Sequence, residues 1–492
     1  MATQHPDNAR KLSWYPRPVV STLAELKESF LCFKEFDIDE YNWDWEGKFV
    51  DEEVYDRLLH NFYNYFSDHP IGKEKFITFR IPNPRVESQF RLARAFMVAI
   101  TSSQHAKSLG FSSPPIFEAI LPLTETAEDI FNIQEAFAEL VSVKNPLLKM
   151  DHSIQKLEVI PLFEQVSIII NSADILRRYL KLYKNKFRRH PEYIRPYIAR
   201  SDPALNSGIV PTVLAAKVAL SEYQKFQDKS GVALYPLLGT GSLPFRGSMN
   251  PENLDNVISE YKGVATFTIQ SAFRYDYPKE SVKKAVARLK KVLPQTPQKV
   301  SPKDKEIIKK IIPEAELPYR NSVELLAPLI NKISKTFPKR RERLQHIGLF
   351  GYSRGVGKVK LPRAIPFTGS LYSIGLPPEL IGTGRILKRL KNKGLMDIVL
   401  KHYIHLKNDM IMAGYFLNKE NIARIGQKIG LEKELKEDIE GIETTLNIEL
   451  GPKRSIHHEH KLLTNKIYKR IEKRNNIANL ITASGKLRRS LG

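Results

Sequence analysis

Short apolar runs recur along this chain, and most neighbouring runs are separated by enough residues for one helix. Eight runs have the length and composition of buried strands, and they span residues 76–81, 116–123, 156–164, 193–200, 233–239, 264–271, 344–351 and 364–370. The segments between them, such as RLARAFMVAITSSQHAKSL and VSIIINSADILRRYLKLY, carry apolar residues at helical spacing. Eight strands alternating with helices is the count of a (β/α)8 barrel, so the sequence predicts an α/β fold of the TIM-barrel type.

The spacing of the runs departs from a regular barrel in two places. Residues 272–343 separate the sixth run from the seventh, which is enough for a helical insertion, whereas the seventh and eighth runs are too close for a full helix between them. The last part of the chain reads as nearly all helix. We therefore expect one domain over residues 1–492, with the barrel over about 76–382, the insertion over about 272–343 and an all-helical C-terminal layer over about 383–492.

The chain has 492 residues and a single cysteine, Cys32, which excludes a disulfide framework and a thiolate metal cluster. Cys32 lies in the segment ELKESFLCFKEF, where a small apolar packing role is favoured over that of a nucleophile. The N-terminal segment lacks the apolar stretch of a signal peptide, and no run of about 18 apolar residues occurs. We therefore expect a cytoplasmic protein with no membrane partner.

The charge is strongly unbalanced. Lys and Arg number 77 against 54 Asp and Glu, which gives a formal net charge of +23. Such an excess is typical of proteins that bind nucleic acid, a membrane surface or small anions. Most of the cationic stretches, such as KKAVARLKK and FPKRRER, read as solvated faces of helices, and no zinc finger or RNA-recognition motif occurs. We expect the charge to serve anion capture and solubility, with no nucleic-acid partner.

Two acidic residues follow neighbouring strand-like runs. Glu164 ends the run KLEVIPLFE, Asp202 follows the run in IARSDPALNSG, and 38 residues separate them, about one strand–helix period. The carboxyl ends of barrel strands converge on one mouth, where active sites are built. Mg²⁺ commonly takes one or two carboxylates and completes its shell with water and substrate oxygens. The pair is therefore a candidate metal site; the alternative is that one or both acids cap the following helices.

Four arginines lie at or close to other strand ends. Arg80 closes the first run, Arg246 lies in GTGSLPFRGS, Arg354 lies in GYSRG, and Arg363 precedes the eighth run in LPRAIPF. Arginine presents a planar fork of donors that suits phosphate and carboxylate oxygens. The glycines beside Arg246 and Arg354 let backbone N–H groups approach an anion. Two acids and four arginines at one mouth predict a divalent metal and a small, highly anionic substrate.

Several long and unusual strings indicate a family that this chain resembles. They are TQHPDN, DWEGK, IPLFE, RSDPALNSG, GTGSLPFRG, GYSRG and LPRAIPFTGSLYSIGLPPELIG, and together they extend over essentially the whole chain. The sequence resembles phosphoenolpyruvate carboxylase of the short archaeal type. The resemblance implies a Mg²⁺-dependent reaction of phosphoenolpyruvate with bicarbonate, which gives oxaloacetate and phosphate through carboxyphosphate and the enolate of pyruvate. It also implies a homotetrameric, allosteric enzyme of anaplerotic CO₂ fixation.

The resemblance implies roles for individual residues. Glu164 and Asp202 would bind Mg²⁺, with Mn²⁺ as an alternative, and the metal would contact the phosphate and enol oxygen of the substrate. His5 in TQHPDN would act on carboxyphosphate, as a proton acceptor or by stabilising its charge; otherwise a histidine so close to a chain terminus reads as a solvated tail residue. The substrate anions would contact Arg80, Arg246, Arg354 and Arg363, of which Arg246 and Arg363 would also act in catalysis.

The chain departs from the longer bacterial and plant enzymes at identifiable positions. Leu205 stands in SDPALN where those enzymes carry a lysine, and the glycine-rich loop holds one arginine instead of two. Gly492 is a looser match to the C-terminal tail that reaches their active site. The string IHHEH contains His457, His458 and His460. No other metal ligands accompany these histidines, so a polar loop or helix start is favoured over a metal site.

Three other functions remain open from the sequence. One is a different Mg²⁺-dependent barrel lyase or mutase that acts on a phosphoenolpyruvate-like anion, which only its product distinguishes from a carboxylase. Another is RNA binding, which the charge of +23 would explain and which predicts steeply salt-dependent affinity. The third is a glycosidase that uses Glu164 and Asp202, and it predicts a pocket poor in arginine with no metal requirement.

Overall fold

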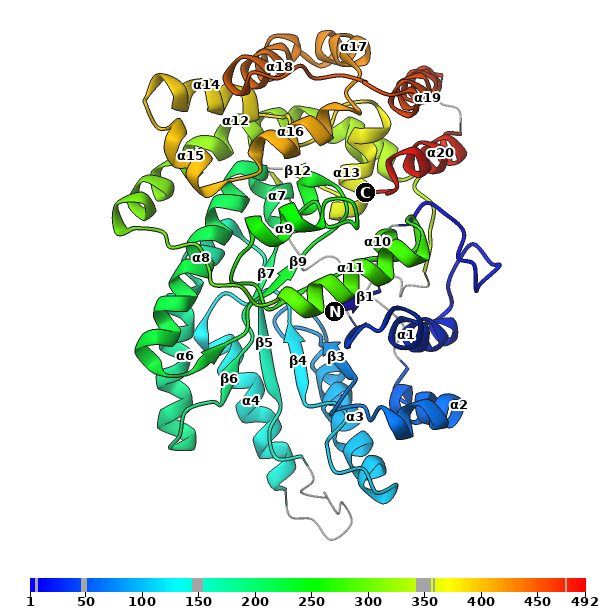
Figure 1. The fold of residues 1–492 in the computed structure, drawn as a ribbon, viewed down its shortest axis with the longest axis vertical. Helices are drawn as coiled ribbons and strands as arrows, with labels where there is room; N and C mark the ends of the chain where they lie inside the picture. Colours follow the sequence, from blue (N-terminus) through cyan, green and yellow to red (C-terminus); the bar gives the residue numbers. More distant parts are fainter. Residues whose placement is uncertain (5–7, 46–50, 144–153, 342–354, 357–358, 474–475) are drawn as a thin grey trace.

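A curled, eight-stranded parallel sheet forms the centre of the molecule (Figure 1). The computed structural model describes residues 1–4, 8–45, 51–143, 154–341, 355–356, 359–473 and 476–492. The strands of the sheet, in spatial order, are β1 (Ala2–Thr3), β2 (Glu40–Asp44), β3 (Phe76–Arg80), β4 (Glu118–Leu121), β5 (Glu158–Phe163), β7 (Tyr197–Ala199), β9 (Leu237–Gly239) and β10 (Thr266–Phe267). The expected α/β architecture built on parallel strands is confirmed.

The two edges of this sheet meet through backbone contacts. Ala2 in β1 forms a parallel bridge with Ile269, which lies just past the end of β10. The N–H of Thr3 donates to the carbonyl of Ile269 at 3.1 Å, and the N–H of Ile269 donates to the carbonyl of Met1 at 2.9 Å. The curl of the sheet therefore brings its first strand beside the chain that follows its last strand.

Helices follow most of the strands and pack around the sheet (Figure 1). Those of the first half of the chain are α1 (Thr22–Phe36), α2 (Val54–Asp68), α3 (Gln89–Ser108), α4 (Ala127–Ser142), α5 (Val166–Ile169), α6 (Ser172–Phe187), α7 (Ser201–Ser207) and α8 (Ile209–Ser230). The next are a short 3₁₀ turn, η1 (Pro244–Arg246), and α9 (Leu254–Glu260), α10 (Ser271–Tyr275), α11 (Lys279–Val292) and α12 (Pro302–Ser334). Two small sheets are made by β6 (Tyr193–Ile194) with β8 (Ala233–Leu234) and by β11 (Gly355–Val356) with β12 (Val359–Lys360).

The last helices form a layer over the carboxyl ends of the strands, at the top of Figure 1. They are α13 (Ala364–Ser373), α14 (Thr383–Asn392), α15 (Met396–His402), α16 (Leu406–Gly414), α17 (Lys419–Ile429), α18 (Glu432–Leu446), α19 (Ser455–Glu472) and α20 (Ala478–Arg488). Two of them cross closely at glycines, because a Cβ atom on Gly384 of α14 would lie 1.8 Å from the carbonyl oxygen of Asp438 in α18. This layer supplies one wall of the site described below.

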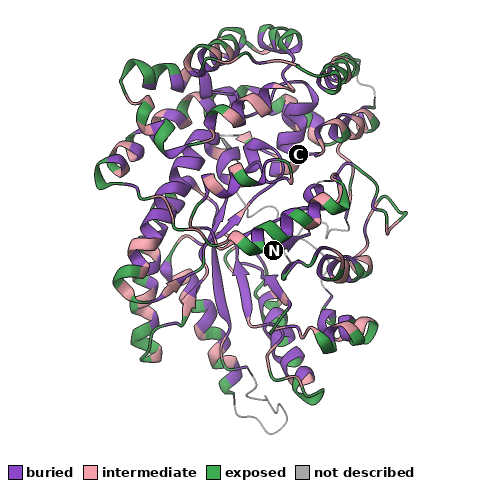
Figure 2. Ribbon diagram, in the orientation of Figure 1, coloured by how far each residue is buried: buried purple, intermediate pink, exposed green. Residues whose placement is uncertain are grey.

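The interior of the sheet contains charged residues as well as apolar ones. Figure 2 shows the central strands as buried, and all five residues of β2 are buried. Arg195 forms ion pairs there with Glu40, at 2.7 Å, and with Glu118. Strands covered on both faces are usually continuous apolar runs. Because β2 contains polar residues, it has no such run, and the sequence does not predict it. The sequence predicts the first strand near residue 76. The first strand of the sheet is instead β1, which begins at residue 2.

The run expected to form the eighth strand, residues 364–370, is helical instead. It belongs to α13, which follows Arg363 at φ −57° and ψ 157° and contains Pro366 in its first turn. A short apolar run suits a buried helix as well as a buried strand, and a proline in the first turn of a helix costs no helical hydrogen bond. The run 344–351 lies outside the described residues.

The other six expected strands are present at least in part. The runs 76–81, 116–123 and 156–164 contain β3, β4 and β5. The runs 193–200 and 233–239 are each divided into two short strands, with Pro196 and Pro236 at the breaks, and only part of 264–271 forms β10. In the described part of the chain, no helix is both long enough and apolar enough to cross a membrane.

Candidate active site

A cavity of about 600 Å³ opens where the carboxyl ends of several strands meet α13. Five of the seven predicted site residues line it, and they are Arg80, Glu164, Asp202, Arg246 and Arg363. The other two, His5 and Arg354, lie outside the described residues. Residues distant in the chain are thus brought together at one mouth, which is the arrangement expected of side chains at barrel strand ends.

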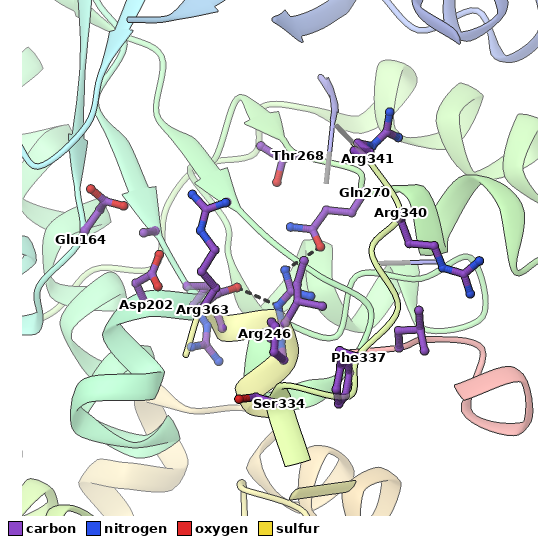
Figure 3. A pocket seen from close by; sticks show the side chains of 18 of the residues that line it. Glu164, Asp202, Arg246, Thr268, Gln270, Ser334, Phe337, Arg340, Arg341 and Arg363 are labelled. Carbon is purple, nitrogen blue, oxygen red and sulfur yellow. Dashed lines mark hydrogen bonds between the residues drawn. The ribbon is translucent and has the colours of Figure 1, made fainter. Parts of the chain in front are cut away.

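The two candidate metal ligands lie on the same side of the cavity in Figure 3. Glu164 directly follows β5 and is 8% exposed, and its Oε2 accepts the N–H of Leu123 at 2.7 Å. Asp202 is the second residue of α7. The residues that precede the helices here are Gln165 for α5 and Arg200 for α7. Neither acid therefore occupies the N-cap position that the capping alternative required.

These carboxylates fit one class of metal ion. Among the described residues, no group of three or more His, Cys, Asp or Glu side chains could hold a metal ion. A hard cation such as Mg²⁺ needs fewer protein ligands, because it retains several waters and shares its shell with substrate oxygens. Glu164 and Asp202 therefore suit an ion shared with an anionic ligand and do not suit one enclosed by protein ligands alone.

Arg246 is held in place by two side chains that follow strands of the sheet. It lies in η1 and is 2% exposed. Its Nε donates to Ser201 Oγ at 3.1 Å and its Nη2 donates to Gln270 Oε1 at 2.6 Å, as the dashed lines in Figure 3 show. Ser201 follows β7 and Gln270 follows β10. Two strand ends thus fix the direction of this guanidinium in the cavity.

The glycines next to Arg246 are required by close packing. A Cβ atom on Gly241 would lie 2.9 Å from Cζ of Arg246, and one on Gly247 would lie 2.9 Å from Cγ2 of Thr240. Gly247 also has φ +109°, a region that side-chain-bearing residues rarely adopt. The glycine-rich composition of this loop therefore makes room for the arginine head and for the turn that presents it.

The other two described arginines reach the cavity from different elements. Arg80 is the last residue of β3 and pairs with Asp44 at the end of β2. Arg363 directly precedes α13, and Figure 3 shows its side chain between Asp202 and Arg246. The motif around Arg363 thus lies at the cavity, although the run that follows it is a helix and not a strand.

Sequence reasoning missed several residues that line the same cavity, including Arg200, Gln270 and Arg340. Arg200 is fully buried, and its Nε donates to the Tyr261 hydroxyl at 2.8 Å. Arg200 and Gln270 lie at the ends of predicted strands, so the rule that found Asp202 could have found them. Arg340 belongs to FPKRRER, which was read as a solvated face; the structure places it and Arg341 at the cavity instead.

The cavity carries far more positive than negative charge. Its described lining includes two carboxylates, Glu164 and Asp202, and eight cationic side chains, which are Arg80, Arg200, Arg246, Lys335, Lys339, Arg340, Arg341 and Arg363. Arg341 is neutralised by ion pairs with Glu25 and Glu28, and Arg80 is neutralised by its ion pair with Asp44. Burial lowers the pKa of Arg340. The remaining excess favours a small ligand with several negative charges.

The three histidines of IHHEH belong to the C-terminal layer and not to this cavity. They lie in the first two turns of α19. His457 Nδ1 accepts the N–H groups of Lys453 and Arg454, each at 3.3 Å, so it closes the start of the helix. His460 is buried against Arg488, with 2.8 Å between His460 Nε2 and Arg488 Nη1. The interpretation of this string as a helix start is confirmed.

Comparisons with known proteins agree with these observations. The family model described as phosphoenolpyruvate carboxylase matches residues 1–492. A protein of that name from Leuconostoc mesenteroides is 40% identical over 464 residues, which cover 94% of this chain and 92% of the relative. Its namesake from the archaeon Metallosphaera sedula is 38% identical over 481 residues, 94% of this chain and 93% of the relative. The phosphoenolpyruvate carboxylase from Pyrococcus abyssi is 38% identical over 458 residues, which cover 89% of this chain and 93% of the relative.

Proposed function

The chain belongs to the phosphoenolpyruvate carboxylase family and is an enzyme of that family, and we propose that it joins phosphoenolpyruvate and bicarbonate to give oxaloacetate and phosphate. One observation carries the proposal: two carboxylates and an excess of arginines from distant parts of the chain line one cavity. Phosphoenolpyruvate is a compact anion that carries a phosphate and a carboxylate. A cavity of this charge and chemistry suits both groups.

Glu164 and Asp202 are the residues that would hold Mg²⁺ in this enzyme, with Mn²⁺ as the alternative. The ion would supply Lewis-acid polarisation of the phosphoryl and enol oxygens. The hydrogen bond from Leu123 N–H orients the Glu164 carboxylate, and Asp202 lies in the first turn of α7; both observations support this assignment. The arginines would then neutralise the substrate charge that the metal does not.

The proposed chemistry divides into two parts. In the first, an oxygen of bicarbonate attacks the phosphorus of phosphoenolpyruvate, the bond from phosphorus to the enol oxygen breaks, and carboxyphosphate and the pyruvate enolate form. Arg246, held by Ser201 and Gln270, and Arg363 would present fixed positive charge to the transferring phosphoryl group and the enolate. Preorganised charge of this kind stabilises a transition state without reorganisation cost at the moment of reaction.

In the second part, carboxyphosphate breaks down to CO₂ and phosphate, and the enolate carbon attacks CO₂ to form oxaloacetate. His5 would take up the carboxyphosphate proton or stabilise its charge, as its motif implies. The residue before it, Gln4, accepts the N–H of Asp44 at 2.8 Å, and Asp44 pairs with the cavity residue Arg80. These contacts anchor the segment next to His5 close to the cavity and support its assignment. Arg80 and Arg354 would bind substrate anions.

We also propose how the sheet closes, how the domain is organised and how the enzyme assembles. The backbone contacts between β1 and Ile269 favour a closed (β/α)8 barrel, with the helical insertion and the C-terminal layer as parts of one carboxylase domain over residues 1–492. The family resemblance favours a cytoplasmic homotetramer under allosteric control. The arginine-rich lining speaks against the glycosidase alternative, which required a pocket poor in arginine.

One assay tests the function directly. Purified protein receives phosphoenolpyruvate, ¹³C-bicarbonate and Mg²⁺, and oxaloacetate is read through malate dehydrogenase as NADH consumption. We expect NADH loss that requires all three additions, with the label in the malate produced. Conversion of phosphoenolpyruvate to another product without incorporation of the label would instead identify a different lyase or a mutase.

A further inference from the structure

The C-terminal helical layer contacts the loop that carries Arg246 through hydrogen bonds. This Arg246 loop, residues 240–250, contains η1, and its backbone closes on itself because Gly241 N–H donates to the Arg246 carbonyl at 2.7 Å and Met249 N–H donates to the Gly241 carbonyl at 2.9 Å. Two carboxylates of the C-terminal layer contact it, Glu379 and Asp409. They are 0% and 7% exposed.

Glu379 binds the backbone directly before Arg246. Its Oε1 accepts the N–H of Phe245 at 2.7 Å and the hydroxyl of Tyr372 at 2.7 Å. The ring of Phe245 stacks on Phe367 of α13, with ring centroids 5.8 Å apart. The backbone of the Arg246 loop is therefore joined to the same helix that follows Arg363.

Asp409 binds the other side of the same turn. Its Oδ1 accepts the hydroxyl of Ser248 at 2.6 Å, and its Oδ2 accepts the hydroxyl of Tyr403 at 2.7 Å. Ser248 has φ +59°, an unusual value for a residue with a side chain. Arg246 thus lies between two loop residues, Phe245 and Ser248, that are each hydrogen-bonded to a buried acid.

These acids are costly to keep where they are. Among the described residues neither forms an ion pair with Lys, Arg or His, and an unpaired buried carboxylate is strongly disfavoured. Burial accordingly raises the pKa of Glu379 to about 7 and that of Asp409 to about 6. Neutral residues would fill the same space at lower cost, so the presence of two acids at this loop points to a role beyond packing.

We propose that Glu379 and Asp409 are positioning residues through which the C-terminal helical layer fixes Arg246 in the active site. Ser201 and Gln270, which follow strands of the sheet, hold the guanidinium, whereas the layer holds the loop through Phe245 N–H and the Ser248 hydroxyl. The inference rests on the proposed function, because it assigns these acids to the placement of a residue that acts on the substrate. A displacement of about 1 Å in such a residue can cost about 10²-fold in rate.

The test compares Glu379→Ala with a matched control, Asp438→Ala. Asp438 is also a buried acid of the C-terminal layer, at 1% exposed, and it accepts the N–H of Gly382 at 2.8 Å and pairs with Arg385. Within the described part of the chain, no hydrogen bond or ion pair joins it to the Arg246 loop. Melting temperatures, kcat and KM are measured for each variant in the full-length protein. We expect both variants to melt earlier, with kcat reduced about 10²-fold in Glu379→Ala and by less than about two-fold in the control.

Further variants separate positioning from stability. Glu379→Gln keeps an oxygen acceptor for Phe245 N–H and should recover most of kcat. Ser248→Ala removes one hydroxyl from Asp409 and should lower kcat several-fold. The lost hydrogen bond should also lower the melting temperature, but by less than the loss of a whole buried acid, so this variant decides the question if Glu379→Ala does not fold. Equal losses of kcat in Glu379→Ala and Asp438→Ala, or wild-type kcat in Ser248→Ala, would overturn the proposal.

A second readout keeps this test independent of the proposed reaction. Calorimetric titration with phosphoenolpyruvate measures anion binding to the wild type and each variant. We expect binding to weaken in Glu379→Ala and not in Asp438→Ala. If the wild-type protein forms no oxaloacetate, the proposed function fails, while the titration still shows whether Glu379 positions Arg246 for an anion. Unchanged affinity in Glu379→Ala would count against the positioning role.

Discussion

Arg80 and Asp44 form a bidentate ion pair across neighbouring strands β3 and β2. The Nε of Arg80 donates to Asp44 Oδ1 at 2.8 Å, and its Nη2 donates to Oδ2 at 2.6 Å. Arg80 is 9% exposed and Asp44 is 4% exposed. Such a fork fixes the plane of the guanidinium, so Arg80 enters the cavity in a set direction.

The pair predicts the behaviour of Asp44→Asn. The substitution removes the charge that orients Arg80, so we expect KM for phosphoenolpyruvate to rise several-fold, together with a loss of stability of about 3–5 kcal/mol for a broken buried pair. Glu87→Gln is the control, because Glu87 pairs with Arg91 outside the cavity lining. If Asp44→Asn lowers stability and leaves KM as in the control, Arg80 does not bind substrate.

The metal assignment predicts that Glu164→Gln and Asp202→Asn bind Mn²⁺ weakly. Each removes one of the two carboxylates that would hold the ion, so turnover should nearly vanish while the fold persists. Electron paramagnetic resonance measures free Mn²⁺ directly and does not depend on activity, and circular dichroism checks the fold. Wild-type Mn²⁺ affinity in both variants would show that the metal lies elsewhere.

Part of the fold could be predicted from the sequence because continuous burial leaves a clear pattern. β3, β4 and β5 coincide with apolar runs. The strand β2 was missed because Glu40, Asn42 and Asp44 are buried polar residues that interrupt its apolar character. The strand β1 has two residues, too few for any periodicity. The run 364–370 was misassigned because its length and composition suit a buried helix equally well.

The candidate site was easier to predict than the fold around it. Glu164, Asp202, Arg246 and Arg363 stand in distinctive strings near predicted strand ends, and all four line one cavity. The supporting residues were not visible, because their roles depend on contacts between distant segments. Glu379, for example, binds Phe245 across 134 positions of sequence, and nothing in the string LPPELIG identifies that partner.

The buried cluster around Glu28 predicts an acid-sensitive fold. Glu28 is 0% exposed, and its carboxylate accepts hydrogen bonds from Arg274 at 2.9 Å and from Arg341 at 2.6 and 2.9 Å. Burial alone would raise the pKa of Glu28, but the two arginines outweigh it and lower the pKa to about 2 from 4.5. The stabilisation is therefore complete above about pH 4.5 and is lost as the pH falls towards 2.

Glu28→Gln should lose this contribution at every pH. The variant leaves two buried guanidinium groups without their shared counter-charge, so we expect a destabilisation of about 3–5 kcal/mol near neutral pH. Urea unfolding measures the free energy of unfolding of both proteins at pH 7 and at pH 3. The difference between the wild type and the variant should be smaller at pH 3. A difference that does not change with pH would contradict the lowered pKa of Glu28.

Glu379 predicts the opposite pH dependence. Burial raises its pKa to about 7 from 4.5, so the folded state holds the proton more tightly than the unfolded state, and stability falls as the pH rises from about 4.5 to about 7. At about 1.36 kcal/mol for each pKa unit, the effect is about 3 kcal/mol. Glu379→Gln carries no titrating group at this position, so its stability relative to the wild type should rise over that interval. Urea unfolding measures the free energy of unfolding of both proteins across this pH interval. The same pH dependence in the two proteins would refute the raised pKa of Glu379.

The two parts of the proposed reaction predict different products from His5→Asn and Arg363→Ala. If His5 acts on carboxyphosphate, it is not needed for the first phosphoryl transfer, so His5→Asn should still cleave phosphoenolpyruvate in a bicarbonate-dependent way. The enolate, without timely CO₂, would be protonated, and phosphate and pyruvate should form with little oxaloacetate. Arg363 contributes fixed charge to every anionic state, so Arg363→Ala should depress all products together. Phosphate, pyruvate and oxaloacetate are quantified in parallel; an unchanged ratio of oxaloacetate to phosphate in His5→Asn would return His5 to the interpretation of a solvated tail residue.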